Sequence, residues 1–287
     1  MPPQEADGYK VIIGQRLDKP AALPIWRRSR LAHRLVYETD DDWFSVPPER
    51  FRNPGGRETY LDTLTHCAQV ADIITVSTGP LGEVMARETG HRDVRVLPNR
   101  IPGALLTLKR QRNRRKVVVG WQGGLSHEAD VAMIAPALRA FAEKHPRAEL
   151  HMMGCQWPHL TGPVRFTDWV PVNASLDYYR GIDFDIGLAP LTGTVFDQSK
   201  SAIKALEYMA LGIPVLASDV EPYRGVVIDG VNGYLIRDPG DWGRRLHELA
   251  CDPAAREELG AKAMATAREH TIEKNWWRWR DVYKELL

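Results

Sequence analysis

Short apolar runs rich in β-branched residues alternate with longer segments of helical periodicity along almost the whole chain, and this alternation constrains the fold most. In the first part, the strand candidates are 10–15, 34–40, 72–78 and 94–99. The helix candidates between them are 21–33, 57–71 and 80–89. Strands that alternate with helices predict a parallel sheet with helices on both faces.

A polar, highly charged stretch, LKRQRNRRK at 108–116, interrupts the pattern, which then restarts. The second set of strand candidates is 117–123, 149–154, 164–170, 185–191, 214–218 and 232–237. The second set of helix candidates is 130–144, 173–180, 199–211, 220–228, 240–250, 253–269 and 272–287. We therefore predict an α/β protein with two Rossmann-like, doubly wound parallel-sheet domains and a ligand crevice at the carboxyl ends of their strands.

The predicted domain boundaries follow from this pattern. Residues 1–107 form a reduced N-terminal domain, 108–116 a linker and 117–270 the second domain. Residues 271–287 form a C-terminal helix that we expect to pack back toward the N-terminal domain. Its residues Trp276, Trp279, Tyr283 and Leu286 recur at near-helical spacing, so one face of this helix should be buried.

Composition excludes several classes of protein. Of the 287 residues, 44% are hydrophobic and 26% are charged, which is typical of a globular protein. The three cysteines, Cys67, Cys155 and Cys251, lie far apart without a CxxC pair, which argues against a disulfide scaffold or a zinc cluster and for a reducing cytoplasm. No apolar run is long enough to span a bilayer, and the N-terminus does not resemble a signal peptide.

The net charge is only +1, but the two halves of the chain differ in charge. Residues 1–116 carry 20 basic against 14 acidic side chains, and the remainder carries 18 against 23. This asymmetry is what two domains with different ligands would show.

The segment FDQSKSAIKALEYMALGIPVLAS (196–218) carries the strongest site signal. We expect a helix from Ser199 to Gly212 that places Lys200, Lys204 and Glu207 on one face. Two lysines near a helix N-terminus are electrostatically unfavourable, and a bound anion would relieve the repulsion. The alternative is an exposed polar stripe with a weak Lys204–Glu207 pair.

Two further segments follow predicted strands. In VVVGWQGGLSHEAD (117–130), Gly123 and Gly124 allow a ligand to approach the backbone, although the pattern is not GxGxxG. His127 either contacts a ligand hydroxyl or phosphate, or caps or packs the following helix. In ETDDDW (38–43), a D-x-D pair can hold a divalent metal, but a solvated strand end with helix-capping aspartates fits equally well.

At these residues the chain resembles the retaining glycosyltransferases of the GT-B fold, family four (glycosyl transferases group 1). GWQGGLSHEAD resembles the family's glycine loop, SKSAIKALEYMALGIPVLAS its donor-binding helix and strand, and EPYRGVVIDGVNGYLI a later turn and strand. LVYETDDDW and ITVSTGPL resemble the first domain of a short subgroup found in bacterial glycan clusters and phages.

The resemblance implies a nucleotide-diphosphate sugar bound between the domains and transfer with retention, without an obvious protein nucleophile. Glu207 matches the second glutamate of an E-x7-E motif that holds ribose hydroxyls, whereas the first glutamate is replaced by Ser199. Lys200 and Ser201 would neutralise the diphosphate, agreeing with the dipole argument. The implied donor-binding residues are Gly123, Gly124, Trp169, Val170, Ser199, Lys200, Ser201, Lys204 and Glu207.

Catalytic roles are then expected for Lys200, Glu207 and His127. No cofactor or metal is obligatory in this fold, and dependence on a divalent metal stays open. Trp169 and Val170 fall where family members contact the nucleobase. The expected acceptor-side residues are Asp40, Asp41, Asp42, Arg27 and Arg28.

The acceptor itself stays open among a glycan, a protein and hydroxymethylated phage-type DNA. The arginines of helix 24–34 would meet DNA phosphates, or form a solvated face or a weak contact with acidic lipid headgroups. We expect a cytoplasmic protein of a bacterial cell or a phage-infected host. A sugar-nucleotide epimerase and a non-catalytic sugar-nucleotide binding module are the alternatives, the latter suggested by Ser199 and the short first domain.

Overall fold

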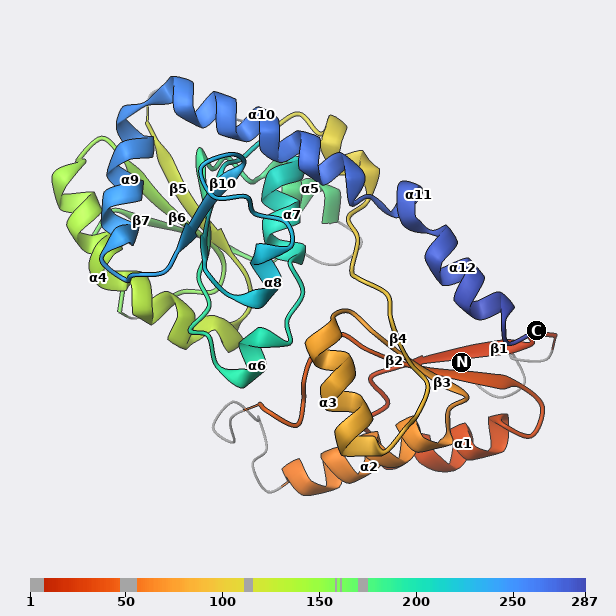
Figure 1. Cartoon of the computed structure of the whole chain (residues 1–287). Helices are drawn as coiled ribbons and strands as arrows, with labels where there is room; N and C mark the ends of the chain where they lie inside the picture. Colours follow the sequence, from red (N-terminus) through yellow and green to blue (C-terminus); the bar gives the residue numbers. More distant parts are fainter. Residues whose placement is uncertain (1–7, 47–55, 111–115, 158, 161, 170–174) are drawn as a thin grey trace. The chain divides into compact units, whose positions relative to one another are not determined.

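The computed structural model describes residues 8–46, 56–110, 116–157, 159–160, 162–169 and 175–287 (Figure 1). The chain divides into two compact units. Unit 1 comprises Met1–Asn99, Gln198–Ser201 and Asn275–Leu287, and unit 2 comprises Arg100–Asp197 and Ala202–Lys274. The first change of unit thus falls at Asn99–Arg100, before the expected linker at 108–116, of which residues 111–115 lie outside the described part.

Unit 1 contains a four-stranded parallel sheet in the order β1-β2-β3-β4. Its strands are β1 (Val11–Gln15), β2 (Arg34–Thr39), β3 (Ile73–Val76) and β4 (Val94–Val96). Its connecting helices are α1 (Ala22–Ser29), α2 (Arg57–Val70) and α3 (Gly79–Thr89). In register, Val36 lies opposite Ile13 on one side and Ile73 on the other.

All three connecting helices cover the same face of this sheet. Tyr37 and Ile74 point into a core that also contains Trp26 of α1, Cys67 of α2 and Leu81 of α3. The reason is topological: right-handed crossovers that always step in one direction place every helix on one face. Unit 1 is therefore a parallel-sheet α/β domain as predicted, but it is wound in one direction rather than doubly wound with helices on both faces.

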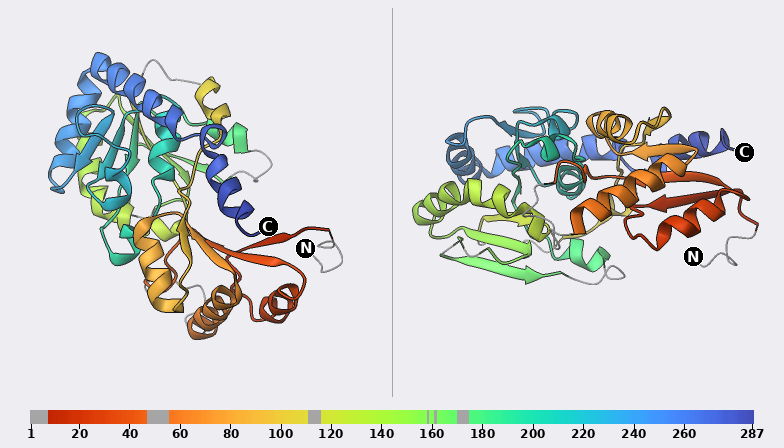
Figure 2. Two further views of the ribbon diagram at one scale, coloured as in Figure 1. Left: turned by 45° about the vertical axis from the view of Figure 1, so that its right-hand side comes forward. Right: turned by 90° about the horizontal axis from the view of Figure 1, so that it is seen from below.

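The last helix, α12 (Trp277–Lys284), lies on the opposite side of the unit 1 strands (Figure 2). Its Tyr283 hydrogen-bonds to Glu38 on β2 and lies near Thr75 on β3. Glu285, the residue after Lys284, pairs with Arg95 on β4 at 3.2 Å. This helix therefore contacts the sheet face that the connecting helices leave bare.

The C-terminal segment is not one continuous helix as predicted. It breaks into α11 (Ile272–Asn275) and α12, at the point where the chain passes from unit 2 into unit 1. Trp276 lies at this passage and is 51% exposed, so the prediction that it is buried is wrong. Trp279, Tyr283 and Leu286 are half-buried.

Unit 2 contains a six-stranded parallel sheet in the order β10-β9-β8-β5-β6-β7. Its strands are β5 (Val118–Gln122), β6 (Glu149–Gly154), β7 (Val164–Asp168), β8 (Ile186–Ala189), β9 (Val215–Ser218) and β10 (Gly233–Ile236). The strand order reverses between β5 and β8, so this sheet is doubly wound as predicted and has a topological switch point there.

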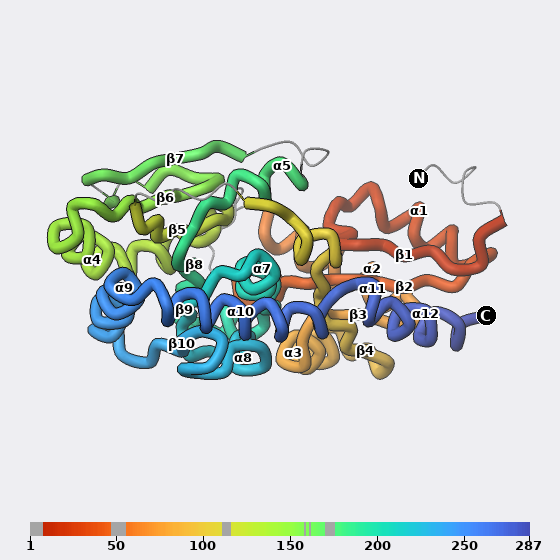
Figure 3. The backbone as a smooth tube through the Cα atoms, turned by 90° about the horizontal axis from the view of Figure 1, so that it is seen from above, coloured from red at the N-terminus to blue at the C-terminus, as the bar shows by residue number. Residues whose placement is uncertain are grey.

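Helices cover both faces of the unit 2 sheet, with α4 and α9 on one side and α7 on the other (Figure 3). One core contains Trp121 with Leu138 of α4 and Leu246 of α9, and the second contains Phe184 with Tyr208 of α7 and Ala263 of α10. The helical elements of unit 2 are η4 (Gly103–Thr107), η5 (Leu125–His127), α4 (Glu128–Lys144), α5 (Ser175–Arg180), α6 (Val195–Gln198, whose last residue is assigned to unit 1), α7 (Ile203–Ala210), α8 (Glu221–Arg224), α9 (Asp241–Cys251), α10 (Pro253–Glu269) and α11.

Among the described residues, no helix has both the length and the apolar character needed to cross a membrane.

Candidate functional site

The candidate site lies in unit 2, where β5 and β8 end at the switch point of the sheet. Gly123 follows β5 in a tight space: a Cβ there would lie 2.7 Å from the Trp121 ring and 3.2 Å from Lys204 Nζ. Only glycine fits between these side chains. Gly124 has open space around it, since a Cβ there would meet nothing within 4 Å. The turn therefore packs its first glycine inward and leaves its second accessible.

Glu207 of α7 is held by donors from two other elements. Its Oε2 accepts a hydrogen bond from Gln122 Nε2, and its Oε1 accepts one from the Tyr179 hydroxyl, both at 2.5 Å. The Tyr178 hydroxyl in turn donates to Gln122 Oε1 at 3.1 Å. Burial raises the pKa of Glu207, and the bonds from Tyr179 and Gln122 and the charge of Lys204 oppose that rise. The carboxylate is thus fixed in orientation beside the end of β5.

Lys204 supplies a buried cation close to the same turn. Its Nζ lies 4.6 Å from the centroid of the Trp121 ring, and its side chain is buried. Lys204 also occupies the first turn of α7, where the partial charge of the helix is already positive. A buried cation at a positive helix end favours an anionic ligand.

The helix that carries these residues starts later than predicted. α7 begins at Ile203, so Lys200 does not share a helix face with Lys204 and Glu207, and that prediction is wrong. Residues 198–201 belong to unit 1. There the Ser199 carbonyl accepts a bond from Thr78 Oγ1 at 2.8 Å, and Ser201 Oγ accepts one from Asn99 Nδ2 at 3.1 Å. These tertiary bonds stabilise a non-helical backbone.

Lys200 lies within unit 1, with its Nζ 3.8 Å from Asp41 Oδ1. The helix-dipole argument made for Lys200 therefore applies to Lys204 instead. The role of Lys200 as a diphosphate ligand rests on the resemblance and stays a prediction.

The carboxylate nearest along the chain to Ser199 is that of Asp197, two residues earlier. Ser199 is buried, and the Asp197 carboxylate is used inside its own loop. Asp197 Oδ2 accepts bonds from both Thr192 Oγ1 and Thr194 Oγ1, at 2.8 and 2.9 Å. This carboxylate therefore shapes the loop after β8.

His127 is oriented by a buried aspartate. Its Nδ1 lies 2.7 Å from Asp130 Oδ2, and Asp130 Oδ1 accepts the Thr192 backbone N–H at 2.9 Å. Although His127 is the N-cap residue of α4, its side chain makes no capping bond, which contradicts the capping interpretation. A carboxylate at Nδ1 favours the tautomer with its proton on that nitrogen. Asp130 thus joins the turn after β5 to the loop after β8.

An aromatic pair lies near the carboxyl end of β7. Trp169 is 53% exposed and stacks on Tyr178 with ring centroids 5.5 Å apart. Gly154, at the end of β6, has φ +99°, and a Cβ there would lie 2.4 Å from the Gly123 carbonyl oxygen and 2.8 Å from the Trp169 ring. The expected base contact Val170 lies outside the described residues.

The three acidic residues after β2, in unit 1, have different hydrogen-bond partners. Arg16 Nη2 donates to Asp40 Oδ1 at 2.6 Å and to Asp41 Oδ2 at 3.0 Å. Asp42 is fully buried, and its Oδ1 accepts the Phe44 and Ser45 N–H groups at 3.1 Å. β2 ends at Thr39, so the alternation of strand side chains does not govern these residues. Burial raises the pKa of Asp41, and Lys200 opposes this most strongly.

The helix predicted at 24–34 ends at Ser29, so its arginines do not all lie on one helix and that prediction is wrong. Arg30 follows α1 and Arg34 begins β2, and both pair with Asp72 at 3.2 Å. Arg27 and Arg28 are exposed on α1. Two of the four predicted phosphate-binding arginines are therefore already engaged by a carboxylate.

Gln122, Tyr179, Asp130 and Gly154 belong to the site although the sequence did not single them out. Gln122 and Tyr179 meet Glu207 from 85 and 28 residues away, so no local spacing identifies them. Asp130 could have been predicted, because it stands three residues after His127 in the same motif, and this spacing brings two side chains together on a helix.

Comparison with known proteins gives the same assignment for the second half of the chain. Residues 116–252 match the family described as glycosyl transferases group 1. The D-inositol 3-phosphate glycosyltransferase of Streptosporangium roseum is 35% identical over 122 residues, which are 42% of this chain and 26% of that protein. The protein of the same description from Nocardiopsis dassonvillei is 37% identical over 113 residues, 39% of this chain and 23% of that protein. The chain thus matches only about a quarter of the length of these relatives.

Solved structures show the same fold over nearly the whole chain. Sucrose-phosphate synthase from Thermosynechococcus elongatus superposes with a TM-score of 0.74 at 17% identity, covering 99% of this chain and 75% of that one. HepE of Anabaena, in complex with UDP-glucose, gives a TM-score of 0.71 at 17% identity, covering 98% and 80%. The prediction of a GT-B fold with two parallel-sheet α/β domains is confirmed.

Proposed function

Because residues 116–252 belong to the glycosyl transferases group 1 family, we propose that the chain transfers a glycosyl group from a nucleoside diphosphate sugar to a hydroxyl acceptor. The observation that carries this proposal is the half-buried Glu207, held by Gln122 and Tyr179 beside the glycine turn and Lys204. HepE of Anabaena, which shares the fold, has been solved with UDP and with UDP-glucose, so uridine is the first base to test.

Each part of the donor has a matching feature in unit 2. The Glu207 oxygens each accept one protein hydrogen bond and have a second lone pair for a ribose hydroxyl. The exposed Trp169, stacked on Tyr178, offers a flat apolar surface for a nucleobase. Lys204 and the N-terminus of α7 offer positive charge to the diphosphate. The accessible backbone at Gly124 lets the phosphates or the sugar approach closely.

The proposed reaction breaks the bond between the anomeric carbon and the diphosphate oxygen and forms a bond from that carbon to the acceptor oxygen. The nucleoside diphosphate leaves with the electron pair of the broken bond, and the acceptor hydroxyl passes its proton to an oxygen of this leaving diphosphate. Lys204 and the α7 N-terminus stabilise the charge that develops on the leaving group, and Lys200 is the predicted second cation. His127, oriented by Asp130, would contact a sugar hydroxyl. We further propose retention of configuration, from the resemblance.

The acceptor side is proposed in unit 1, at Asp40 and Asp41, with the exposed Arg27 and Arg28 as contacts for a phosphate-bearing acceptor. The proposed acceptor is a glycan, a protein or hydroxymethylated DNA. Transfer to DNA would weaken steeply as salt is raised, because arginine contacts with phosphates release counterions.

The test is calorimetric titration of the full chain with uridine, guanosine, adenosine and cytidine diphosphates, with and without Mg²⁺. We expect one nucleotide to bind and Glu207→Gln to weaken its binding while the circular dichroism spectrum stays unchanged. Binding of none of them, or unchanged affinity in a folded Glu207→Gln variant, would overturn the donor site.

Product analysis with the matching nucleotide sugar then separates the reactions. A glycosylated acceptor supports the proposal. An isomerised or hydrolysed donor formed without acceptor identifies an epimerase or a hydrolase, and binding without turnover identifies a non-catalytic module.

A further inference from the structure

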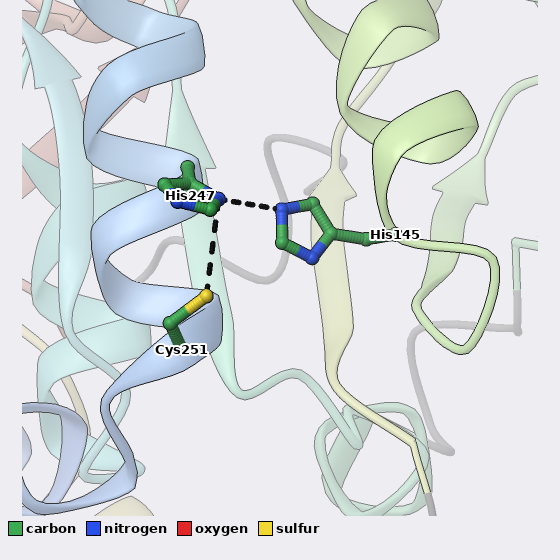
Figure 4. A group of neighbouring side chains, drawn as sticks. All are labelled: His145, His247 and Cys251. Atoms are coloured by element: carbon green, nitrogen blue, oxygen red, sulfur yellow. Dashed lines mark hydrogen bonds between the residues drawn. The ribbon is translucent and has the colours of Figure 1, made fainter.

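Three side chains that can bind metal converge in unit 2, away from the site described above (Figure 4). They are His145, which follows α4, and His247 and Cys251, both on α9. His145 Nε2 lies 2.8 Å from His247 Nδ1, and Cys251 Sγ lies 3.8 Å from the same nitrogen. The three ligand atoms all lie within 4.8 Å of one another.

The fold itself brings these residues together. His247 and Cys251 are four residues apart, so they share one face of α9. The helices α4 and α9 pack on the same face of the sheet, through Leu138 and Leu246 in a common core. Phe141, one turn earlier on α4, stacks on the His145 ring with centroids 4.6 Å apart and limits the orientations of that ring.

We propose that His145, His247 and Cys251 bind a divalent metal ion of the zinc class. Two imidazole nitrogens and one thiolate are a ligand set that Zn²⁺ prefers, with bonds of about 2.0–2.1 and 2.3 Å. Around a tetrahedral ion such ligand atoms stand roughly 3.3–3.6 Å apart. To reach this spacing, the two imidazole nitrogens separate by about half an ångström and the Cys251 sulfur moves closer to both of them. Rotations of the imidazole rings and of the exposed Cys251 side chain supply these shifts.

The protons balance in the binding step. In the metal-free state one imidazole nitrogen donates a hydrogen bond to the other, so one of these two atoms carries a proton. On binding, both nitrogens coordinate through their lone pairs. The ring that donated the hydrogen bond moves its proton, through solvent, to its other nitrogen, where the accepting ring already carries its own. The Cys251 thiol gives up its proton to solvent as it becomes a thiolate ligand. Water fills the fourth position of the ion.

The surroundings select against cations held by charge alone. Lys144 and Arg147 are exposed and line the same surface hollow as His145. Their positive charge repels hard cations such as Mg²⁺ and Ca²⁺, which also require oxygen ligands. An ion that forms strong bonds to nitrogen and sulfur is stable there, because the thiolate offsets part of the local charge.

The cluster acts on stability rather than on the transferred group. α4 has 17 residues, and His127 and His145 flank its two ends. At 1.5 Å per residue these ends are about 25 Å apart, too far for one ion to touch both sites. The ion would fix the end of α4 to the last turn of α9. This inference does not depend on the proposed transferase activity.

The test uses the full chain, treated with a chelator under reducing conditions and titrated with Co²⁺ as a spectroscopic probe. We expect one Co²⁺ per chain, a thiolate-to-cobalt charge-transfer band, intense visible bands of a four-coordinate ion, and loss of all of these when Zn²⁺ is added. Cys251→Ser should abolish the charge-transfer band and His247→Ala the tetrahedral bands. Cys155→Ser, which changes another partly accessible thiol, should leave the spectrum unchanged.

Thermal unfolding gives a second measurement for the same variants. Zn²⁺ binds only the folded cluster, so it should raise the midpoint of the wild-type chain and of Cys155→Ser, and not that of Cys251→Ser. Cys251 is exposed, so its replacement should leave the metal-free chain folded. The proposal is overturned if no charge-transfer band forms, if the band survives in Cys251→Ser, or if Cys155→Ser removes it. Nucleotide affinity, measured with and without Zn²⁺, reports the donor site separately.

Discussion

Glu207 holds its charge in surroundings that oppose it. Burial raises its pKa, yet Gln122 and Tyr179 donate to both of its oxygens and so favour the ionised form. A carboxylate that is desolvated but oriented by two donors is well suited to bind hydroxyl groups, because its remaining lone pairs point in fixed directions. It also makes ligand binding sensitive to pH.

Donor binding should weaken as the pH falls through the raised pKa of Glu207, above the ordinary value of 4.5. The ionised carboxylate accepts two ribose hydroxyls, whereas the protonated form loses part of that accepting capacity. In Glu207→Gln the affinity should be lower and this pH dependence absent. Because the diphosphate titrates too, the quantity to measure is the difference in nucleotide affinity between wild type and variant from about pH 5 to pH 8. A difference that does not change with pH would contradict the prediction.

The same titration affects folding with the opposite sign. A carboxyl whose folded pKa is raised favours the folded state when it is protonated, and this contribution is lost as the pH rises through the folded value. The residue thus binds ligand best in the charge state that stabilises the fold least.

Lys204→Met should lower the affinity for the nucleoside diphosphate by about 10- to 100-fold, the effect of removing one hydrogen bond from a charged group. Methionine keeps the apolar contact with the Trp121 ring, so the midpoint of thermal unfolding should stay the same or rise. Lys262→Met is the matched control, since Lys262 pairs with Glu258 on the surface of α10. Equal affinities of the two variants would show that Lys204 does not face the diphosphate.

Several residues that the sequence analysis selected from local motifs lie together in the structure. Gly123, Gly124, His127, Lys204 and Glu207 all lie in unit 2 around the ends of β5 and β8. It did not identify the partners that orient them, because Gln122 and Tyr179 meet Glu207 only after the sheet and α5 are assembled. The group of His145, His247 and Cys251 was not found for the same reason: cysteine spacing says nothing of two histidines 102 residues apart.

The start of α7 shows tertiary bonds overriding local preference. Ser199 is a favourable N-cap residue, and SKSAIKAL contains no helix breaker, so the pattern alone extends the helix to Ser199. The bonds from Thr78 to the Ser199 carbonyl and from Asn99 to Ser201 stabilise a non-helical segment instead. A shift of four residues at one end moves Lys200 from the helix face to the side of Asp41.

Gly154→Ala should destabilise the protein more than Gly162→Ala. Both glycines have φ above +90°, so alanine costs a similar backbone strain, of about 1 kcal/mol, at each. Only at Gly154 would the new Cβ clash, 2.4 Å from the Gly123 carbonyl, whereas at Gly162 nothing lies within 4 Å.

The excess destabilisation at Gly154 should be about 1–3 kcal/mol, measured by urea unfolding. Gly154→Ala should also weaken nucleotide binding, because relieving the clash displaces the glycine turn. Equal free energies of unfolding for the two variants would mean that the ends of β5 and β6 do not approach as closely as the structure has them.

At the scale of the whole chain, the alternation of strands and helices predicted the two parallel sheets of the structure and the ten strands described in them. It could not predict that unit 1 winds in one direction, because apolar alternation marks strands without giving their order in a sheet. The strand order determines which face of the sheet the connecting helices leave without a packed layer. In unit 1 the bare face contains Val36 and Ile73, both buried, and α12 contacts that face through Tyr283.

Removal of residues 276–287 should therefore destabilise unit 1 selectively. The cut exposes apolar side chains on β2 and β3 and removes the Tyr283 and Glu285 contacts, whereas the sheet of unit 2 loses none of its own strands or helices. Differential scanning calorimetry should show one transition moving to lower temperature. The nucleotide identifies the other transition, because a ligand held mainly by unit 2 raises the midpoint of that unit most.

Tyr283→Phe separates the hydrogen bonds of this contact from its apolar part. It removes the hydroxyl that bonds to Glu38 and should lower the free energy of unfolding of unit 1 by about 1 kcal/mol, far less than the truncation. If the truncation instead shifts the transition that responds to nucleotide, or shifts neither, α12 is not what stabilises the bare face. The one-way winding of unit 1 would then be stable without a second layer, contrary to the requirement that a parallel sheet be covered on both faces.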